Sequence, residues 1–277
     1  MTISYASAAH VMYILIALLI PTVLYFVLRG KSQKMQKYVI ISIMLLNVFQ
    51  HLFKSLIYPQ YLGFGFNALN TAYNMCAFLI LISPIALLIP IRPVRDFVFY
   101  AGSFAGIIAV IVPYWHIGEY AFTWDVIRFF ICHALLFTSS VLTIALGLHK
   151  PSYKCFPFLG LGFLLGVGLV ILNDVICLSL GIYIGFEHME IGEALRTMNP
   201  CWSFGVPEQF SFIIPVAKFF LPDFMVGENA TGSFTPILWY AIPVYLAMTL
   251  LAFPITVAVD RKRFSYDLKR YLDSTKK

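Results

Sequence analysis

The sequence predicts an all-α protein: a polytopic membrane helix bundle of seven transmembrane helices, with the N-terminus outside and the C-terminus in the cytoplasm. Of its 277 residues, 60% are hydrophobic and 12% are charged, against about 45–50% and about 25% in soluble domains. Long apolar stretches recur along the chain, and basic residues fall between them in a regular order. A soluble enzyme, a disordered segment and a nucleic-acid-binding module are excluded, because a globule of this length could not bury so much apolar surface.

Each expected span is a stretch of about 20 mainly apolar residues, the length that crosses a bilayer core of about 30 Å. The first is interpreted as a span rather than a cleaved signal peptide, because no basic residue precedes it and its apolar run is too long. One transmembrane domain, 1–258, is therefore expected. Its spans are 11–29, 38–57, 68–90, 94–114, 122–148, 156–182 and 234–258.

The basic residues predict the orientation of the bundle. Seven spans place four of them in the first connection, two in the third, two in the fifth and seven in the tail 259–277, which is 15 of the 19. Only Arg196 and Lys218 fall in the connections on the other side. The positive-inside rule assigns the basic side to the cytoplasm. We expect a multi-pass protein of the cell membrane, most simply the bacterial plasma membrane, with a tail that forms a basic amphipathic helix at the headgroups.

The sixth connection, about 183–233, is the one long loop, and it is acidic and outside in this topology. Within it, 209–221 is apolar but too short to span, and Pro215 would break a straight helix. A re-entrant or interfacial segment over the outer face is expected, with a loosely attached lid as the alternative. Asn229-Ala230-Thr231 matches the N-glycosylation pattern, which matters only in a eukaryotic secretory pathway.

Four of the expected spans carry polar side chains, which are costly in hydrocarbon and therefore face the bundle interior. The second and sixth spans run outward and carry them late, whereas the third and fifth run inward and carry them early. All four sets should then lie in the outer half of the membrane and form one outward-facing polar pocket. Its predicted binding residues are His51, Lys54, Asn70, Tyr73, Asn74, Asp125, Arg128, Asn173 and Asp174.

Simpler roles exist for several of these residues. Asparagine and glutamine often only bond helices together. Lys54 and Asp125 lie close enough to helix ends to reach the headgroups, and His133 could be an ordinary interior histidine. Asp125 and Arg128 are three residues apart and should pair. Asp174 needs a partner, for which Lys54, Arg128 and His51 are the candidates.

Residues 70–148 resemble the YwaF-type family of bacterial integral membrane proteins. The resemblance lies in Asn74-Met75-Cys76, in Gly102, Gly106 and Pro113, and in the segment from Arg128 to Phe137 that contains His133. That family is similar, more distantly, to eukaryotic transmembrane acyltransferases that remodel ether phospholipids. The resemblance implies a membrane-embedded nucleophilic cysteine near the start of the third span and a histidine at the position of His133.

Two departures from the family pattern stand near Cys76. The bacterial family has a histidine two residues before the cysteine, where this chain has Asn74. The cysteine of the eukaryotic branch falls on Tyr73 here, so either position, 73 or 76, could correspond to the nucleophile. On a continuous helix Cys76 would also point away from the face that carries Asn70 and Asn74.

The leading hypothesis is a lipid-directed acyltransferase with Cys76 as the nucleophile and His133 as its base. The roles expected of the other residues are orientation of the histidine by Asp125 or Asp174, oxyanion binding by Asn70 and Asn74, and phosphate binding by Lys54 and Arg128. The partner of such an enzyme would be a membrane phospholipid or another acyl donor. No cofactor is expected, and a metal site is not, because His51, His133 and Asp174 lack local ligand spacing.

Two further classes stay open. A binding or transport protein would receive a small polar solute in the same pocket and would not need Cys76. A non-catalytic membrane protein would use the polar residues only to hold its helices together. A retinal protein is excluded, because the seventh span has no lysine for a Schiff base. The oligomeric state is left open.

Overall fold

The structure, a computed structural model, describes residues 1–58, 63, 65–206, 211–212, 214–220 and 243–275. Eleven α-helices and no strand lie within these ranges, and Thr2 and Tyr120 form one isolated bridge. The helices are α1 (Ala8–Leu28), α2 (Gln33–Leu52), α3 (Lys54–Ile57), α4 (Met75–Leu88), α5 (Arg92–Ile111), α6 (Trp124–Ala145), α7 (Phe156–Ser179), α8 (Ile191–Met198), α9 (Ile214–Phe220), α10 (Pro243–Val259) and α11 (Arg261–Ser274).

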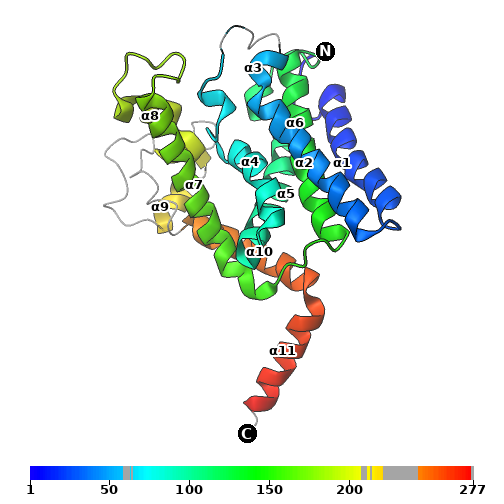
Figure 1. The fold of residues 1–277 in the computed structure, drawn as a ribbon. Coiled ribbons are helices and arrows are strands. Elements are labelled where there is room, and N and C mark those ends of the chain that lie inside the picture. Colours follow the sequence, from blue (N-terminus) through cyan, green and yellow to red (C-terminus); the bar gives the residue numbers. More distant parts are fainter. Residues whose placement is uncertain (59–62, 64, 207–210, 213, 221–242, 276–277) are drawn as a thin grey trace.

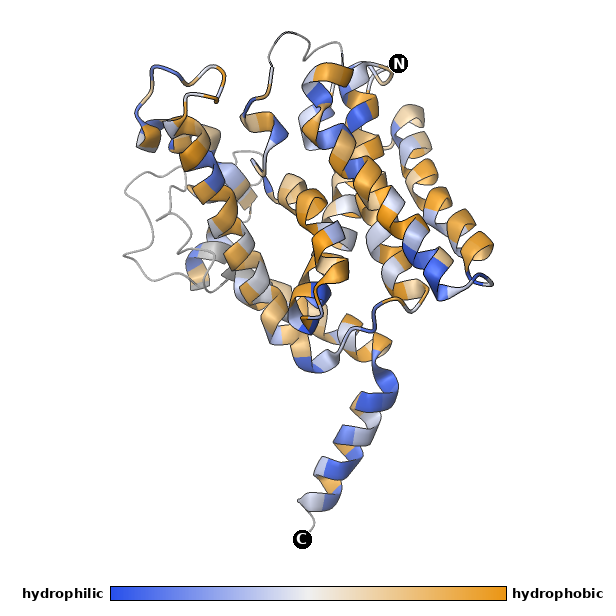
Figure 2. Ribbon diagram, viewed as in Figure 1, coloured by the Kyte–Doolittle hydropathy of each residue, from blue (hydrophilic) through white to orange (hydrophobic). Residues whose placement is uncertain are grey.

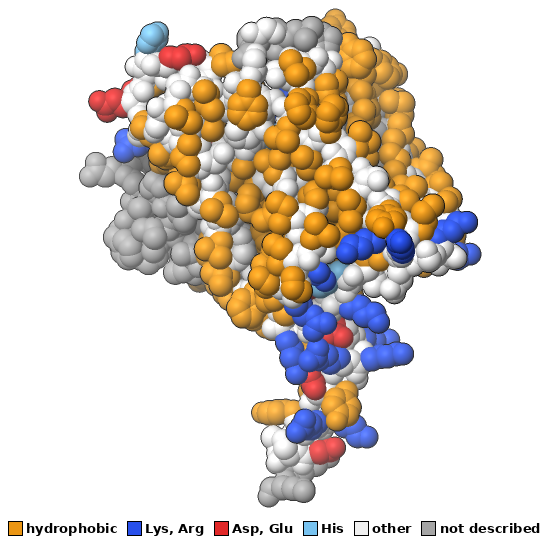
Figure 3. Space-filling view, in the orientation of Figure 1, with side chains coloured by type: hydrophobic (Ala, Val, Ile, Leu, Met, Phe, Trp, Pro, Cys, Tyr) orange, Lys and Arg blue, Asp and Glu red, His pale blue; other side chains and the backbone are white. Residues whose placement is uncertain are grey.

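Helix α6 lies at the centre of the bundle and packs against α1, α2, α4 and α5, while α7 packs against α5 and α10 (Figure 1). Successive long helices reverse direction, as the expected topology requires. These helices consist mainly of hydrophobic residues, whereas α11 projects from one end and is mostly hydrophilic (Figure 2). Lysine and arginine side chains gather at that same end (Figure 3), which we call the basic end.

Four helical segments of the described chain are long and apolar enough to cross a membrane: 8–28, 92–116, 124–145 and 153–179. Two shorter apolar helices are Met75–Leu88 and Met248–Val259. An all-α membrane protein therefore agrees with the prediction. The count of seven spans and the orientation stay predictions, and residues 234–242 of the last expected span lie outside the described residues.

The third expected span is shorter than predicted. A helix from residue 68 was expected, but Ala68–Asn70 is a single 3₁₀ turn and α4 starts only at Met75. Asparagine side chains compete with the helix for local backbone groups. Asn67 and Asn70 close a capping box around the 3₁₀ turn, and the Asn74 side chain accepts a hydrogen bond from the Ala77 N–H at the start of α4.

Two glycines in α5 allow it to approach α6 closely. A Cβ atom on Gly106 would lie 2.7 Å from the backbone nitrogen of Phe137 and 2.8 Å from the carbonyl oxygen of His133. Gly102 lies against the Ser140 side chain one turn away. Small residues four apart are a common device for close helix packing in membranes. This contact positions the stretch of α6 that carries His133.

Where the structure describes them, the outer loop contains the helices α8 and α9, and the tail is helical. Pro215 is the second residue of α9, where its missing N–H breaks no helical bond. The predicted tail helix is confirmed as α11, which Lys154 Nζ anchors through an ion pair of 2.7 Å with Asp267. Its position at the headgroups stays a prediction. Asn229-Ala230-Thr231 and part of 209–221 lie outside the described residues.

Candidate active site

Cys76 and His133 come together from two helices. Cys76 lies in the first turn of α4, and its thiol lies near His133 of α6 and interacts with it electrostatically. His133 Nδ1 lies 2.7 Å from the Phe129 carbonyl oxygen, one turn earlier in α6. Donation of the Nδ1 proton to that carbonyl leaves Nε2 as the basic nitrogen. A thiol beside such an imidazole is the arrangement that activates a sulfur nucleophile.

The start of α4 favours negative charge on Cys76. Free backbone N–H groups and the helix dipole stabilise anions at a helix N-terminus, and thiolates are stabilised there in other proteins. The expectation that Cys76 faces away from Asn70 and Asn74 assumed a continuous helix, and that assumption was wrong. Residues 71–74 are not helical, and this break lets Cys76 reach α6.

A second thiol, Cys132, also lies beside His133. Its Sγ atom is 3.3 Å from His133 Nδ1 and 3.2 Å from the Phe129 carbonyl oxygen. Because Cys132 and the carbonyl share the Nδ1 side of the ring, this thiol does not face the basic nitrogen. It is also buried within α6, whereas Cys76 is only half-buried.

Cys201, a third thiol near this pair, was not singled out by the sequence. It interacts with Cys76 and with the backbone of Met75. Burial raises the pKa of the Cys201 thiol to about 12, so this thiol stays protonated at neutral pH. Its backbone has a φ of 53°, and Asn199 and Trp202 beside it also have positive φ, a conformation that costs non-glycine residues energy.

The charged residues of α3 and of the start of α6 meet at one end of the bundle, opposite the basic end (Figure 1). The predicted Asp125–Arg128 pair is confirmed, with 2.8 Å between Asp125 Oδ1 and Arg128 Nη2. Lys54 is only 1% exposed and lies 4.8 Å from the centre of the Tyr73 ring. The alternative in which Lys54 reaches the headgroups was therefore wrong. The cation instead lies against an aromatic face, which attracts it.

His51 and Asn173 both bond to Thr71, which the sequence did not single out. His51 Nε2 lies 2.9 Å from the Thr71 carbonyl oxygen, and the His51 ring stacks on Tyr73. The Asn173 amide donates to Thr71 Oγ1 over 2.9 Å. The segment before α4 thereby joins α2 to α7. Nothing in the sequence around Thr71 distinguishes it from other threonines, because its neighbours are apolar and amide residues.

Asp174 is fully buried in α7. The hydrogen-bond partner that the structure shows is Asn173 Nδ2, at 3.4 Å from Oδ1, and Tyr183 also interacts with this carboxyl group; neither is among the predicted partners Lys54, Arg128 and His51. Its Oδ2 atom has no hydrogen-bond partner among the described residues. Burial, and then the charge of Asp174, raise the pKa of Tyr183, so the phenol stays a hydrogen-bond donor.

The expected oxyanion role does not fit Asn70. Its amide nitrogen donates to the Leu52 carbonyl oxygen over 2.8 Å, and its Oδ1 accepts from the Asn67 N–H. Asn70 therefore ties the segment before α4 to the end of α2, as the helix-bonding alternative holds. The Asn74 side-chain oxygen caps α4. Asn74 therefore helps to position Cys76 in the first turn of that helix.

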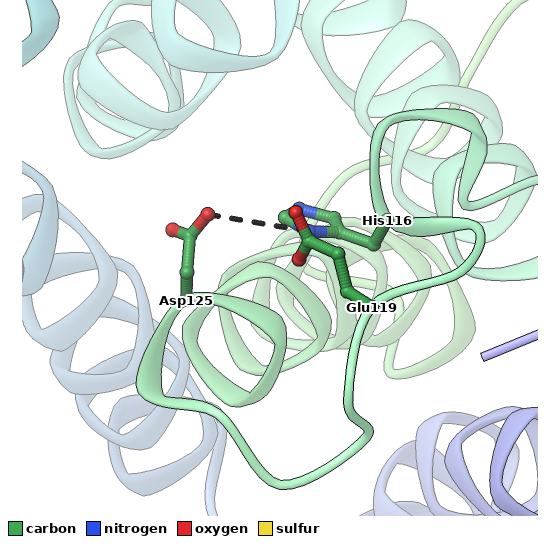
Figure 4. Close-up of side chains that lie close together, drawn as sticks. All are labelled: His116, Glu119 and Asp125. Carbon is green, nitrogen blue, oxygen red and sulfur yellow. Dashed lines mark hydrogen bonds and ion pairs between the residues drawn. The ribbon is translucent and has the colours of Figure 1, made fainter. Parts of the chain in front are cut away.

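His116, Glu119 and Asp125 also lie together at this end (Figure 4). His116 Nδ1 is 2.7 Å from Glu119 Oε2 and 4.0 Å from Asp125 Oδ2. These atom types can hold a metal ion. The Arg128 guanidinium on Asp125 already supplies a positive charge, however, and would repel a cation. The sequence did not single out His116 or Glu119.

These features define a class: a helical membrane protein whose polar side chains collect between its apolar helices, around a thiol–imidazole pair. The chain belongs to the TMEM164 family, whose family model matches residues 5–182. The matched range includes Cys76, His133 and Asp174 and ends before α8. Neither a curated protein nor a solved structure matches the chain.

Proposed function

We propose that this protein transfers acyl chains between lipids in the membrane, with Cys76 as the nucleophile and His133 as the general base. The proximity of Cys76 to His133 is the observation that carries the proposal, because the two residues are 57 positions apart and lie on different helices. The resemblance to the YwaF-type family favours Cys76 and His133, whereas the more distant resemblance to ether-phospholipid acyltransferases favours His133 and has its cysteine at the position of Tyr73.

The reaction has two steps. Cys76 Sγ attacks the ester carbonyl of a donor phospholipid while His133 Nε2 takes the thiol proton. His133 then protonates the departing lysolipid oxygen, which leaves an acyl thioester on Cys76. In the second step, His133 removes the proton of an acceptor hydroxyl, whose oxygen attacks the thioester carbonyl. The thiolate leaves, recovers the proton from His133, and the acceptor carries the acyl chain.

The surrounding residues provide a site for the lipid headgroup. Lys54 and Arg128 carry the positive charges that a phosphate requires. Tyr73 lies beside both Lys54 and His51, and Asn74 positions the turn that carries Cys76. In the proposed seven-span topology these groups lie in the outer half of a cell membrane, so the donor and acceptor would come from the outer leaflet.

The proposal is tested with purified protein in liposomes that contain a phospholipid with a labelled acyl chain and an unlabelled lysolipid. Cys76→Ala and His133→Ala should each reduce label transfer by at least about 10³-fold, because each removes a group that the covalent route requires. Cys132→Ala is the matched control, since it removes the other thiol beside His133, and it should retain transfer. Full activity of Cys76→Ala would refute the proposal.

A solute-binding role is the second candidate, and the unpaired Oδ2 of Asp174 favours it. A buried carboxylate oxygen without a partner is a costly arrangement that a bound donor group would relieve. In this case Asp174→Asn would abolish a solute-dependent increase in the unfolding temperature, and Cys76→Ala would leave that increase unchanged. The acyl-transfer proposal instead predicts that Cys76→Ala loses label transfer in the liposome assay.

A further inference from the structure

A cavity of about 430 Å³ lies at the basic end of the bundle, between the start of α5 and the end of α6. Twelve residues of α4 follow Cys76 toward this end, and at 1.5 Å per residue they span about 18 Å. The cavity is thus distinct from the candidate active site. Its lining residues are Pro90, Arg92, Arg95, Gly147, Leu148, His149 and Lys150.

The lining carries three permanent positive charges and no carboxylate. Among the residues that the structure describes, none of the ion pairs involves Arg92, Arg95 or Lys150. The nearby acidic group, Asp96, is buried and already bonds to His149 and to the Ser152 N–H. The positive charge of the cavity is therefore not neutralised from within.

The cavity walls are held in place by this same buried pair. Asp96 of α5 bonds to His149 and, over 3.1 Å, to the backbone of Ser152, which fixes the chain after α6 against the first turn of α5. Arg95 Nε donates to the carbonyl oxygens of Ala86 and Ile89 at 3.2 Å and 2.6 Å. These bonds fix the position of Arg95 and leave its terminal nitrogens as further donors.

We infer that this cavity binds a phosphate group, supplied by the headgroup of an anionic phospholipid. Two guanidinium groups and an ammonium group are the donors that recognise phosphate oxygens, and arginine can bind them with two parallel hydrogen bonds. The volume falls within the range of small-molecule sites, about 300–1,000 Å³. Anionic lipids are the phosphate source that is concentrated at the membrane surface, beside basic segments.

The test measures binding to the full-length protein in neutral detergent, with short-chain phosphatidylglycerol and, separately, inorganic phosphate as probes. The double variant Arg92→Gln with Lys150→Gln should weaken binding of phosphatidylglycerol about tenfold or more, because it removes two charge-assisted contacts. Arg95 is left intact because of its contacts to α4. The control, Lys31→Gln with Lys37→Gln, removes two exposed charges outside the cavity and should change binding less than about threefold.

A charge-retaining variant, Arg92→Lys with Lys150→Arg, checks that the double variant acts through charge, and it should keep most of the binding. Binding of phosphatidylglycerol without binding of inorganic phosphate would assign the site to a lipid headgroup. Binding of both probes, lost in the same variant, would extend it to soluble phosphates. Equal weakening in the cavity and control variants, or no weakening in either, would overturn the inference.

Discussion

Asp96 shows what a single residue contributes at the basic end. Asp96→Ala leaves His149 and the Ser152 N–H without their buried partner. We expect a loss of about 3 kcal/mol in the free energy of unfolding, because the change leaves two buried polar groups without their hydrogen-bond partner. The measurement is denaturant unfolding in detergent, with exposed Asp273→Ala as the control. A loss no larger than that of Asp273→Ala would contradict the role assigned to Asp96.

Short spacings made some residue pairs predictable from the sequence. Asp125 and Arg128 could be paired in advance, because three residues on one helix place the side chains together. Asp96 and His149 could not, since they are 53 positions apart and meet only through the packing of α5 against the chain after α6. The break at 71–74 was missed because Asn70 and Asn74 were interpreted as residues of a helix face rather than as caps.

At the level of helices, the contact at Gly106 connects stability to the site. Gly106→Ala would place a methyl group against the α6 backbone at His133 and Phe137, at a cost of about 1–3 kcal/mol in the free energy of unfolding. The accompanying shift of His133 should reduce acyl transfer about 10²-fold, the loss that a misplacement of about 1 Å produces.

Gly168→Ala is the matched control for Gly106→Ala. Gly168 is also helical, in α7, but no atom lies within 4 Å of a Cβ placed there. Alanine should therefore stabilise α7 by about 0.5–1 kcal/mol through its higher helix propensity. Both variants are compared by unfolding and by transfer assays. Similar effects at the two positions would show that the close approach of α5 and α6 has no consequence.

The attachment of α11 should depend on pH. Hydrogen bonds from Lys154 and Tyr153 lower the pKa of Asp267, below the ordinary value of about 3.9. A lowered pKa in the folded state means that the contribution is complete above the ordinary pKa and is lost as pH falls through the lowered one. The protection of α11 amides against hydrogen exchange, relative to the intrinsic rate at each pH, should fall below about pH 4. An Asp267→Asn variant with the same pH profile as the wild type would contradict this.

The long apolar helices were the most predictable elements. α1, α5, α6 and α7 begin and end within three residues of their expected limits, because an uninterrupted apolar run is a strong signal. The contacts between helices were not predictable to the same degree. That Cys76 would reach His133 depends on where α4 starts and on the glycines of α5, and neither follows from hydropathy.

For the whole molecule, the orientation of the bundle is the main prediction still to be tested. Seven spans require the connections near residues 30, 91 and 150 and the C-terminus to share the cytoplasmic side. Reporter fusions that are active only in the cytoplasm should therefore be active at these four positions and inactive near residue 190. Activity at residues 30 and 190 together would contradict the topology, and with it the placement of the site in the outer half of the membrane.

The central claim is that Cys76 carries an acyl group with the help of His133. Mass spectrometry of the purified protein after incubation with a donor phospholipid tests it most directly. The account predicts the mass of one acyl chain on Cys76 of the wild type and of Cys132→Ala, removed by hydroxylamine and absent from His133→Ala. An acyl group that forms equally in His133→Ala, or that maps to Cys132 or Cys201 instead, would contradict the account.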